Sequence, residues 1–335
     1  MICVYGAGSI GCYVGGRLAA GGADVVFVGR ERLARETALH GLTLTDLHGA
    51  ELHVDEPRYG IGPEAAAGAD LVLVTVKSAA TADAADALAP HLKPGAVVVS
   101  FQNGLRNAAV LRERLPGAVV LSGMVAFNVV HFGEGRFHCG TDGGLAVQDH
   151  PALDERAAAF DRAGLALSRH TDLTGVQAAK LLVNLNNAVD AIAGLPIKAE
   201  LSQRVYRRCL VLAQREALAA YRAAGIRPGT IAGVDARLLP LVLTLPDALF
   251  TRAAAKILAI DPHARSSTAD DLDAGRPTEV DYLNGEITAL AGEHGLTAPV
   301  NARLTALVHA AEEGGRRDWT GPELLADLRR AARGR

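Results

Sequence analysis

Short apolar runs alternate with amphipathic stretches through the first half of the chain. The runs are rich in Val, Leu and Ile and hold few polar residues, which is typical of strands buried on both faces of a parallel sheet. Helical periods lie between them, and this alternation predicts a doubly wound α/β domain. The expected strands are 2–6, 24–29, 70–76, 96–101 and 119–125, and the expected helices are 10–21, 79–91 and 105–114.

The pattern changes towards the middle of the chain. Two further pairs of segments predict antiparallel β-structure in the first domain: 41–46 with 51–55 as an excursion, and 129–137 with 145–149 as its β-rich end. Beyond about residue 172 helical periods dominate. We therefore expect one domain over residues 1–171 and an all-α C-terminal domain over residues 172–335. The expected helices of the second domain are 175–194, 200–224, 246–260, 279–294 and 300–314.

A glycine-rich motif links the first predicted strand to the first predicted helix. It consists of Gly6, Ala7, Gly8, Ser9, Ile10 and Gly11. The glycine spacing permits a tight turn, close approach of the backbone to a pyrophosphate, and close packing of helix on strand. The helix N-terminus then offers N–H groups to the anion. In this position the motif predicts a Rossmann domain that binds a dinucleotide; the alternative is a glycine-rich turn without a ligand.

The end of the second predicted strand bears on the choice between NAD and NADP. NAD-binding domains usually place an acid there, which binds the ribose 2′-hydroxyl. This chain has Arg30 instead, followed by Glu31. A cation at this position favours a 2′-phosphate, so we expect NADPH as the cofactor. The preference inverts if Glu31 faces the ribose, and a solvated surface arginine is the other alternative.

Polar residues also follow the next two long strands. Lys77 comes directly after the strand 70–76, and Asn103 follows the strand 96–101. Ligands of doubly wound sheets collect at the carboxyl ends of the strands. Lys77 is therefore a candidate for a coenzyme ribose or phosphate, and Asn103 for the nicotinamide ribose or the substrate. The alternatives are a solvated lysine near a helix start and an Asn-Gly turn.

The segment 178–192 reads as a helix that is apolar over most of its girth, yet it carries Lys180, Asn184 and Asn187. At about 100° per residue these three side chains share one stripe. A buried polar group without a partner costs several kcal/mol, so the stripe should face partners or a polar cleft. A lysine there can protonate a developing alkoxide, and burial lowers its pKa. Alternatively Lys180 reaches solvent or pairs with an acid for stability.

The segment 265–287 offers partners for that lysine and for a substrate. It contains Ser266, Ser267 and, after a loop, Glu279. An acid can hold Lys180 protonated and oriented, and a serine hydroxyl can bind a carboxylate. Taken alone, an acid in the first turn of a helix complements the helix dipole, and serines usually cap helices.

Composition and charge narrow the function classes. A length of 335 residues suits two domains, and 49% hydrophobic with 4% aromatic residues is an ordinary globular composition. The net charge of −3 gives no electrostatic reason to expect a nucleic-acid or membrane partner. The four cysteines form no CxxC pair and no HExxH occurs, so we expect neither a metal site nor a disulfide framework, and a cytoplasmic location.

In this order the motifs resemble those of the ketopantoate reductase (2-dehydropantoate 2-reductase) family. The resemblance covers nearly the whole chain and rests on GAGSIG, Arg30, VTVK, QNG, the KLLVN helix and SSTADDLDAGRPTEVDYLNG. It implies a Rossmann domain, a helical domain and an active site in the cleft between them. It also implies that Lys180 is the general acid, with Glu279 as its supporting acid. The implied substrate or nicotinamide contacts are Asn103, Asn184 and Ser267, and the implied coenzyme contacts are Gly6, Gly8, Gly11, Arg30 and Lys77.

The expected activity is the NADPH-dependent reduction of a 2-keto acid, with ketopantoate giving (R)-pantoate in pantothenate biosynthesis. Four departures from the family pattern affect the substrate shell: Ala188, Lys198, Ala264 and Thr268. They leave open a paralogous reductase of another 2-keto or β-keto acid. A non-catalytic NADP(H)-binding sensor is a third reading, which the presence of Lys180 and Glu279 disfavours. A homodimer is possible, with Leu238, Leu239, Leu241 and Leu243 as a dimer face or as core.

Overall fold

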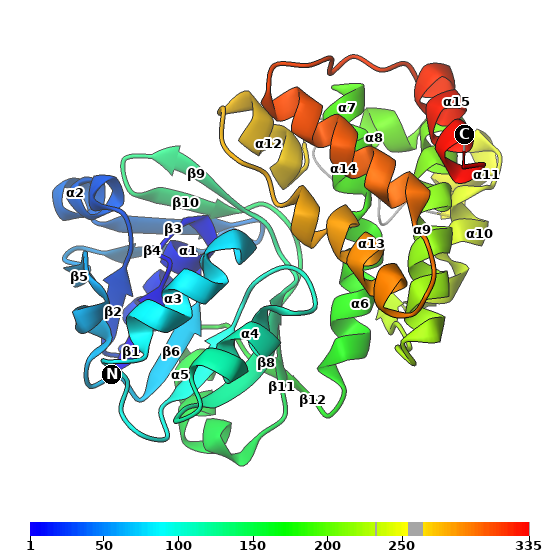
Figure 1. Ribbon diagram of the computed structural model, residues 1–335. Coiled ribbons are helices and arrows are strands. Elements are labelled where there is room, and N and C mark those ends of the chain that lie inside the picture. The colour runs from blue at the N-terminus through cyan, green and yellow to red at the C-terminus, as the bar shows by residue number, and fades with distance from the viewer. Residues whose placement is uncertain (232, 254–263, 335) are drawn as a thin grey trace. The chain divides into compact units, whose positions relative to one another are not determined.

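The computed structural model describes residues 1–231, 233–253 and 264–334. The chain divides into two compact units, Met1–Leu173 and Thr174–Arg335. The first unit is built on a mixed sheet covered by helices, and the second is helical (Figure 1). No helix within the described ranges is both long and apolar enough to cross a bilayer.

The main sheet of the first unit has the strand order β12-β11-β8-β7-β6-β1-β2-β5. All neighbouring strands run parallel except β8 and β11, which are antiparallel. The order reverses between β1 and β6, which is the switch point where doubly wound sheets bind their ligands. The strands are β1 (Ile2–Tyr5), β2 (Val25–Val28), β5 (Tyr59–Gly60), β6 (Leu71–Val74), β7 (Val97–Ser100), β8 (Val119–Val125), β11 (Leu145–Gln148) and β12 (Leu167–His170).

Both faces of this sheet are buried, because successive residues of a strand point to opposite faces. On β1, Val4 joins the core that holds Leu18, whereas Cys3 joins the core that holds Leu88 and Leu111. The helices of this unit are α1 (Ser9–Ala20), α2 (Glu31–His40), α3 (Thr81–Leu88), α4 (Asn107–Arg114) and α5 (Asp154–Arg162), with 3-10 turns η1 (Pro63–Ala66), η2 (Ser78–Ala80) and η3 (Pro151–Leu153). The five long strands expected from the sequence are confirmed. The strands β5 and β12 and the helices α2 and α5 were not predicted.

A smaller sheet has the order β4-β3-β10-β9, with strands β3 (Leu42–Asp46), β4 (Glu51–Val54), β9 (Val129–Gly133) and β10 (Arg136–Cys139). The antiparallel pairing of β3 and β4 confirms the first predicted excursion. The second prediction was partly wrong. Residues 129–137 form a hairpin rather than one strand, since Gly133, Glu134 and Gly135 all have positive φ. The expected partner at 145–149 instead joins the main sheet as β11.

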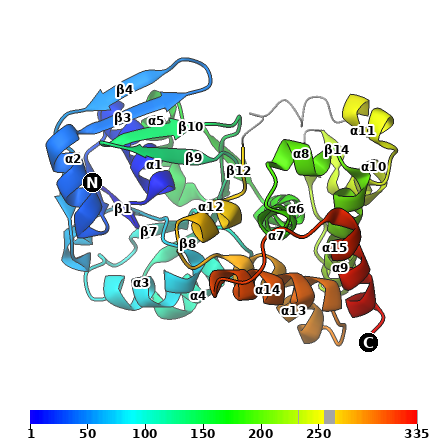
Figure 2. The same cartoon turned by 90° about the horizontal axis from the view of Figure 1, so that it is seen from above.

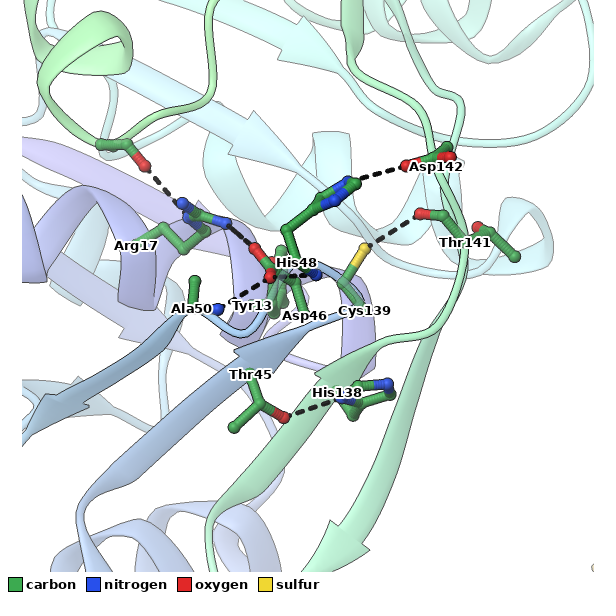
Figure 3. A network of polar contacts seen from close by, with 11 residues as sticks. Tyr13, Arg17, Thr45, Asp46, His48, Ala50, His138, Cys139, Thr141 and Asp142 are labelled. Carbon is green, nitrogen blue, oxygen red and sulfur yellow. Dashed lines mark hydrogen bonds and ion pairs between the residues drawn. The ribbon is translucent and has the colours of Figure 1, made fainter. Parts of the chain in front are cut away.

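A polar network fastens the small sheet to α1 (Figure 3). Arg17 of α1 donates to the Tyr13 hydroxyl at 2.9 Å, to Asp46 Oδ2 at 3.1 Å and to the Ala163 carbonyl at 3.0 Å. Asp46 in turn accepts backbone N–H groups of the turn after β3, from His48 at 2.9 Å and Ala50 at 3.0 Å. Because these partners satisfy one another, a half-buried charge can lie between α1 and the small sheet.

The second unit is built around one long helix, α9, which contacts α8, α10, α13, α14 and α15 (Figures 1 and 2). Its helices are α6 (Leu173–Asn184), α7 (Asn186–Ala193), α8 (Ile197–Leu201), α9 (Arg204–Ala223), α10 (Leu239–Leu243), α11 (Asp247–Ala253), α12 (Ser267–Asp273), α13 (Asn284–Glu293), α14 (Pro299–Glu312) and α15 (Gly321–Ala332), with η4 (Ala236–Leu238) and η5 (Val280–Tyr282). The helical character expected of this domain is confirmed, with one addition. A two-stranded hairpin pairs β13 (Thr230–Ile231) with β14 (Val234–Asp235).

Two details of the second unit differ from the sequence reading. The single helix expected over 175–194 is two helices that part at Leu185. The predicted helix over 246–260 is described only as far as Ala253, and its remainder lies outside the described residues. Of the leucines that were either core or dimer face, Leu239 and Leu243 are buried, whereas Leu238 and Leu241 are exposed.

Candidate active site

The glycine motif lies at the carboxyl end of β1 and opens α1. Gly6 has φ +103°, and a Cβ there would lie 2.4 Å from the Val76 nitrogen, so only glycine fits this turn. A Cβ on Gly11 would lie 2.6 Å from Thr75 Oγ1, which keeps the helix close to β6. Gly8 differs, because it is exposed and the atom nearest to an added Cβ lies 3.9 Å away. The bare backbone at Gly8 and the start of α1 fit a bound pyrophosphate.

Replacement of Gly8 by Ala tests this fit. Gly8 has φ −99°, which alanine adopts without strain, so the melting temperature should stay within about 2 °C of wild type. The added methyl group would occupy the space through which a pyrophosphate reaches the backbone. We expect the dissociation constant for NADPH, measured by fluorescence titration, to rise at least about tenfold. Gly6→Ala is the contrasting variant and should lower the melting temperature instead.

Arg30 stands at the end of β2 and caps α2. It is exposed. Its carbonyl accepts the N–H groups of Leu33 and Ala34, whereas its guanidinium forms no hydrogen bond or ion pair with the described part of the chain. Its neighbours are engaged along the helix, because Glu31 pairs with Arg35, and Arg32 pairs with Glu36 at 3.2 Å. The carboxylate that would favour NAD therefore has a cationic partner of its own, whereas the guanidinium of Arg30 is available to an anion.

Lys77 and Asn103 follow β6 and β7, as the sequence predicted. Lys77 is exposed at the start of η2, and Asn103 is half-buried before α4. The Asn103 carbonyl accepts hydrogen bonds from Ser78 Oγ at 3.2 Å and from Asn107 Nδ2. Asn107 Nδ2 also donates to Ser78 Oγ at 3.1 Å. The backbone that carries Asn103 is thus tied to the residue that follows Lys77.

This link continues as a buried chain of hydrogen bonds that sequence reasoning missed. Asn107 Oδ1 accepts from the Thr81 hydroxyl at 2.7 Å, and Thr81 accepts from Gln102 Nε2 at 2.7 Å. Gln102 also donates to the Val76 carbonyl at 3.0 Å and accepts from Ser100 Oγ at 2.8 Å. A fully satisfied buried network of this kind rigidifies the loops after β6 and β7. The sequence signal that could have predicted this network is a polar residue at each of two helix starts, in KSAAT and in NGLRN.

In the second unit, Lys180 lies on α6 and Glu279 lies immediately before η5. Both residues are half-buried. Burial lowers the pKa of the Lys180 ammonium to about 8, against the opposing effect of the Glu279 carboxylate, which raises it. An ammonium with this pKa is still protonated at neutral pH and releases its proton far more readily than an ordinary lysine.

The two asparagines of the predicted stripe, and the two serines of the segment 265–287, lie around the junction of α6 and α7. Asn184 ends α6 and is half-buried. Asn187 belongs to α7, and its Nδ2 lies 3.5 Å from Ser267 Oγ. Ser267 is exposed at the start of α12, whereas Ser266 is buried and caps that helix through a bond from the Ala269 N–H at 3.1 Å. The two adjacent serines thus have different surroundings, and Ser267 is the one available to a ligand.

Two of the four departures from the family pattern are buried, and the other two are half-buried. Ala188 and Thr268 are buried within the second unit, with 1% and 2% of their surface exposed. Ala264 and Lys198 lie near each other instead, because the Ala264 carbonyl accepts the Ile197 N–H at 3.0 Å. Both are half-buried. Two of the four departures therefore lie around α8 and the segment before α12.

The segment 266–285, which carries part of the family resemblance, also contains a residue with a structural role. Asn284 is fully buried, and its Nδ2 donates to Asn301 Oδ1 at 3.1 Å. Asn301 donates from its backbone and from Nδ2 to Glu216 Oε2, at 3.0 and 2.8 Å. These bonds join α13, α14 and α9, so Asn284 stabilises the helical packing.

Known proteins resemble this chain over almost its full length. The family model for ketopantoate reductase PanE/ApbA matches residues 2–152, and its C-terminal counterpart matches residues 172–312. A 2-dehydropantoate 2-reductase of Halobacterium salinarum is 32% identical over 94% of this chain and 99% of its own length. The chain belongs to the ketopantoate reductase family.

Solved structures agree with this membership. The crystal structure of a PanE/ApbA family ketopantoate reductase from Ralstonia eutropha JMP134 matches with a TM-score of 0.81 and 31% identity, over 94% of this chain and 99% of that one. A D-mandelate dehydrogenase solved with NADH and anilino(oxo)acetate matches with a TM-score of 0.77 but only 19% identity, and it shares the fold alone. The ketopantoate reductase family predicted from the motifs is therefore confirmed.

Proposed function

We propose that this protein reduces a 2-keto acid to a 2-hydroxy acid with NADPH, and that its substrate is ketopantoate, which becomes (R)-pantoate in pantothenate biosynthesis. The observation that carries the proposal is the half-buried Lys180 with the carboxylate of Glu279 nearby. Desolvation brings the pKa of this lysine to about 8, which suits a proton donor at neutral pH. Its relatives named 2-dehydropantoate 2-reductase support the choice of substrate.

Lys180 acts as the general acid. When the keto group is reduced, negative charge develops on its oxygen, and the ammonium of Lys180 transfers a proton to that oxygen. Glu279 has two effects, because its charge keeps the amine protonated and its carboxylate can orient it. We assign the substrate's polar groups to Asn184, Asn187 and Ser267, which surround the junction of α6 and α7.

The first unit holds the coenzyme. Gly6, Gly8 and Gly11 give the pyrophosphate its backbone cradle, with Ala7, Ser9 and Ile10 completing the loop and the first turn of α1. Lys77 and Asn103 are assigned to the ribose and nicotinamide portions, at the carboxyl ends of β6 and β7. The bound nicotinamide coenzyme supplies the hydride.

Arg30 is assigned to the 2′-phosphate, which distinguishes NADPH from NADH. Arg30→Ala should raise the KM for NADPH about tenfold, because an exposed charge-assisted pair is lost, and should leave the KM for NADH within about twofold. Steady-state assays with both coenzymes measure this ratio. Arg58→Ala is the control for loss of a surface arginine, since Arg58 pairs with Asp24 at 2.9 Å and leaves Glu31 held by Arg35. An equal effect of Arg30→Ala on both coenzymes would remove Arg30 from the 2′-phosphate.

The substrate is tested by the purified protein with NADPH and a panel of 2-keto and β-keto acids. Ketopantoate should give the highest kcat/KM. A higher value for another acid would identify a paralogous reductase, and the region around Lys198 and Ala264 is where such a change would arise. Coenzyme binding without turnover of any acid would favour the non-catalytic NADP(H) sensor.

Location and assembly remain predictions. A cytoplasmic enzyme fits four buried cysteines that carry free thiols. In a homodimer, the exposed Leu238 and Leu241 are the residues that we expect the partner to cover, with 48% and 63% of their surfaces accessible in one chain.

A further inference from the structure

A fully buried carboxylate on α7 holds the start of α12. Asp190 has no exposed surface, and its Oδ2 accepts the backbone N–H of Ser266 at 3.0 Å. The two residues are 76 positions apart in the sequence. A carboxylate that accepts a backbone N–H forms a charge-assisted bond, which is stronger and shorter than a neutral one. Asp190 therefore fixes the backbone of Ser266 on α7.

Further bonds extend this attachment towards the proposed substrate residues. Ser266 Oγ donates to the Asn187 carbonyl at 3.3 Å and accepts the Ala269 N–H at 3.1 Å, so the same serine caps α12. The next residue is the exposed Ser267, whose Oγ lies 3.5 Å from Asn187 Nδ2. The bonds between the α12 start and α7 thus help to bring Asn187 and Ser267 together, and Asp190 supplies the charged bond of that attachment.

We infer that Asp190 is a positioning residue for substrate binding, which holds Ser267 and Asn187 in the arrangement that receives the polar groups of the keto acid. The inference rests on the proposed function. We assign Asp190 no contact with substrate or coenzyme, because it acts through Ser266. Its loss should affect substrate binding more than coenzyme binding, because the coenzyme residues belong to the first unit.

The surroundings of Asp190 explain why a carboxylate there is sensitive to pH. Glu200 on α8 is also fully buried, and it accepts Asn186 Nδ2 at 2.9 Å. Asp190 Oδ1, Asn186 Oδ1 and Glu200 Oε1 are buried acceptors with no hydrogen-bond donor among the described residues. Burial raises the pKa of Asp190 to about 6. Burial, together with the negative charge of Asp190, raises the pKa of Glu200 to about 8.

Charged groups on the other elements around α7 modify this balance. The Arg265 guanidinium lowers the pKa of Asp190, whereas Asp270 on α12 raises it. On α9, Arg207 lowers the pKa of Glu200. The charged groups of α14 have partners elsewhere, Arg303 with Asp327, and His309 with Glu312 and Asp281. As the pH falls through about 6, Asp190 gains a proton and becomes a weaker acceptor for the Ser266 N–H.

The test compares Asp190→Ala with the conservative Asp190→Asn. Alanine removes the acceptor, whereas the amide oxygen of asparagine can still accept the Ser266 N–H, and its NH₂ group can donate to the unpaired oxygens nearby. Asp190→Ala should raise the KM for ketopantoate at least about tenfold and leave the NADPH dissociation constant within about twofold. Asp190→Asn should restore the KM to within about threefold of wild type. Asp270→Asn is the control for a neighbouring charge, because the Asp270 carboxylate makes no bond to Ser266; the only link between the two residues is the helical bond from the Asp270 N–H to the Ser266 carbonyl, which the substitution keeps.

Two further readouts separate positioning from general stability. The wild-type KM for ketopantoate should rise as the pH falls from 7 to 5, and the KM of Asp190→Asn should be flat over that range. Hydrogen exchange measured on peptides covering 264–270 should accelerate in Asp190→Ala and return towards wild type in Asp190→Asn.

The positioning role of Asp190 and the proposed reductase function are overturned by different results. Equal KM values in wild type and Asp190→Ala, or equal damage by Ala and Asn, would overturn the positioning role. Unchanged exchange in Asp190→Ala would overturn it without any activity measurement. Absence of turnover of every keto acid by the wild type would overturn the proposed function, and with it the assignment of Ser267 to a substrate.

Discussion

Lys180→Ala is expected to lower kcat at least about 100-fold while NADPH still binds, because a positioned general acid contributes about 10²–10⁴-fold. Single-turnover reduction of ketopantoate, followed by NADPH absorbance, measures the loss on the chemical step. Lys93→Ala is a matched lysine control, since Lys93 pairs with Asp70 at the surface of the first unit. Full turnover by Lys180→Ala would contradict the proposed role of Lys180.

Stability gives an independent check on this result. Desolvation depresses the folded-state pKa of Lys180 to about 8, below its ordinary value of 10.5. The unfolded chain therefore binds more protons than the folded protein between these two pH values. The destabilisation caused by burying the charged ammonium is thus fully present at pH 7. Lys180→Met, which keeps most of the length of the side chain without the charge, should not lower the melting temperature. A loss of kcat in that variant then reports chemistry rather than unfolding.

The pH profile tests the same residue together with Glu279. The acid must be protonated to act, so kcat/KM for the reduction should fall as the pH rises through about 8. The Glu279 carboxylate raises the pKa of Lys180. Glu279→Gln removes that charge, so the fall of kcat/KM should shift to lower pH. If kcat/KM falls at the same pH in Glu279→Gln as in the wild type, Glu279 does not influence the pKa of the lysine.

The coenzyme half of the protein could be predicted closely because its signals are local. Buried parallel strands read as continuous apolar runs, and a glycine-rich turn between strand and helix has few other interpretations. The positions of Lys77 and Asn103 follow from the strands that precede them. The bonds that fix Asn103 could not be predicted, because Ser78 and Asn107 are joined across 29 positions and look like ordinary helix-start residues.

The helical unit shows why periodicity alone gives an incomplete site. A continuous helix would place Asn187 on the stripe of Lys180, but the junction at Leu185 assigns Asn187 to a second helix, beside Ser267. The segment is apolar over most of its girth, yet it is not buried on every apolar side, because 43% of the surface of Val183 is exposed. The role of Asp190 could not be predicted from the sequence, because its partner Ser266 is 76 positions away and a single acid in an apolar helix has no local signature.

Replacement of Arg207 is expected to cause the largest loss of stability. This arginine of α9 has no exposed surface, and its guanidinium donates to three backbone carbonyls, Leu201 at 2.8 Å, Leu243 at 2.9 Å and Leu245 at 2.7 Å. The same group pairs with Asp247 Oδ1 at 2.9 Å and lies 4.1 Å above the ring of Phe250. A single side chain therefore joins α8, the end of α10 and the start of α11 to the central helix.

Arg207→Met should destabilise the second unit by at least about 3 kcal/mol, because methionine fills much of the volume but leaves buried carbonyls without donors. Arg207→Lys should recover little, since an ammonium lacks the planar fork that reaches three carbonyls. Urea unfolding monitored by Trp319, the single tryptophan of the chain, reports on the unit that contains Arg207. The exposed neighbour Arg208 is the control, and Arg208→Met should change stability by no more than about 0.5 kcal/mol. Equal midpoints for the two methionine variants would mean that the buried guanidinium is not what holds α10 and α11 on α9.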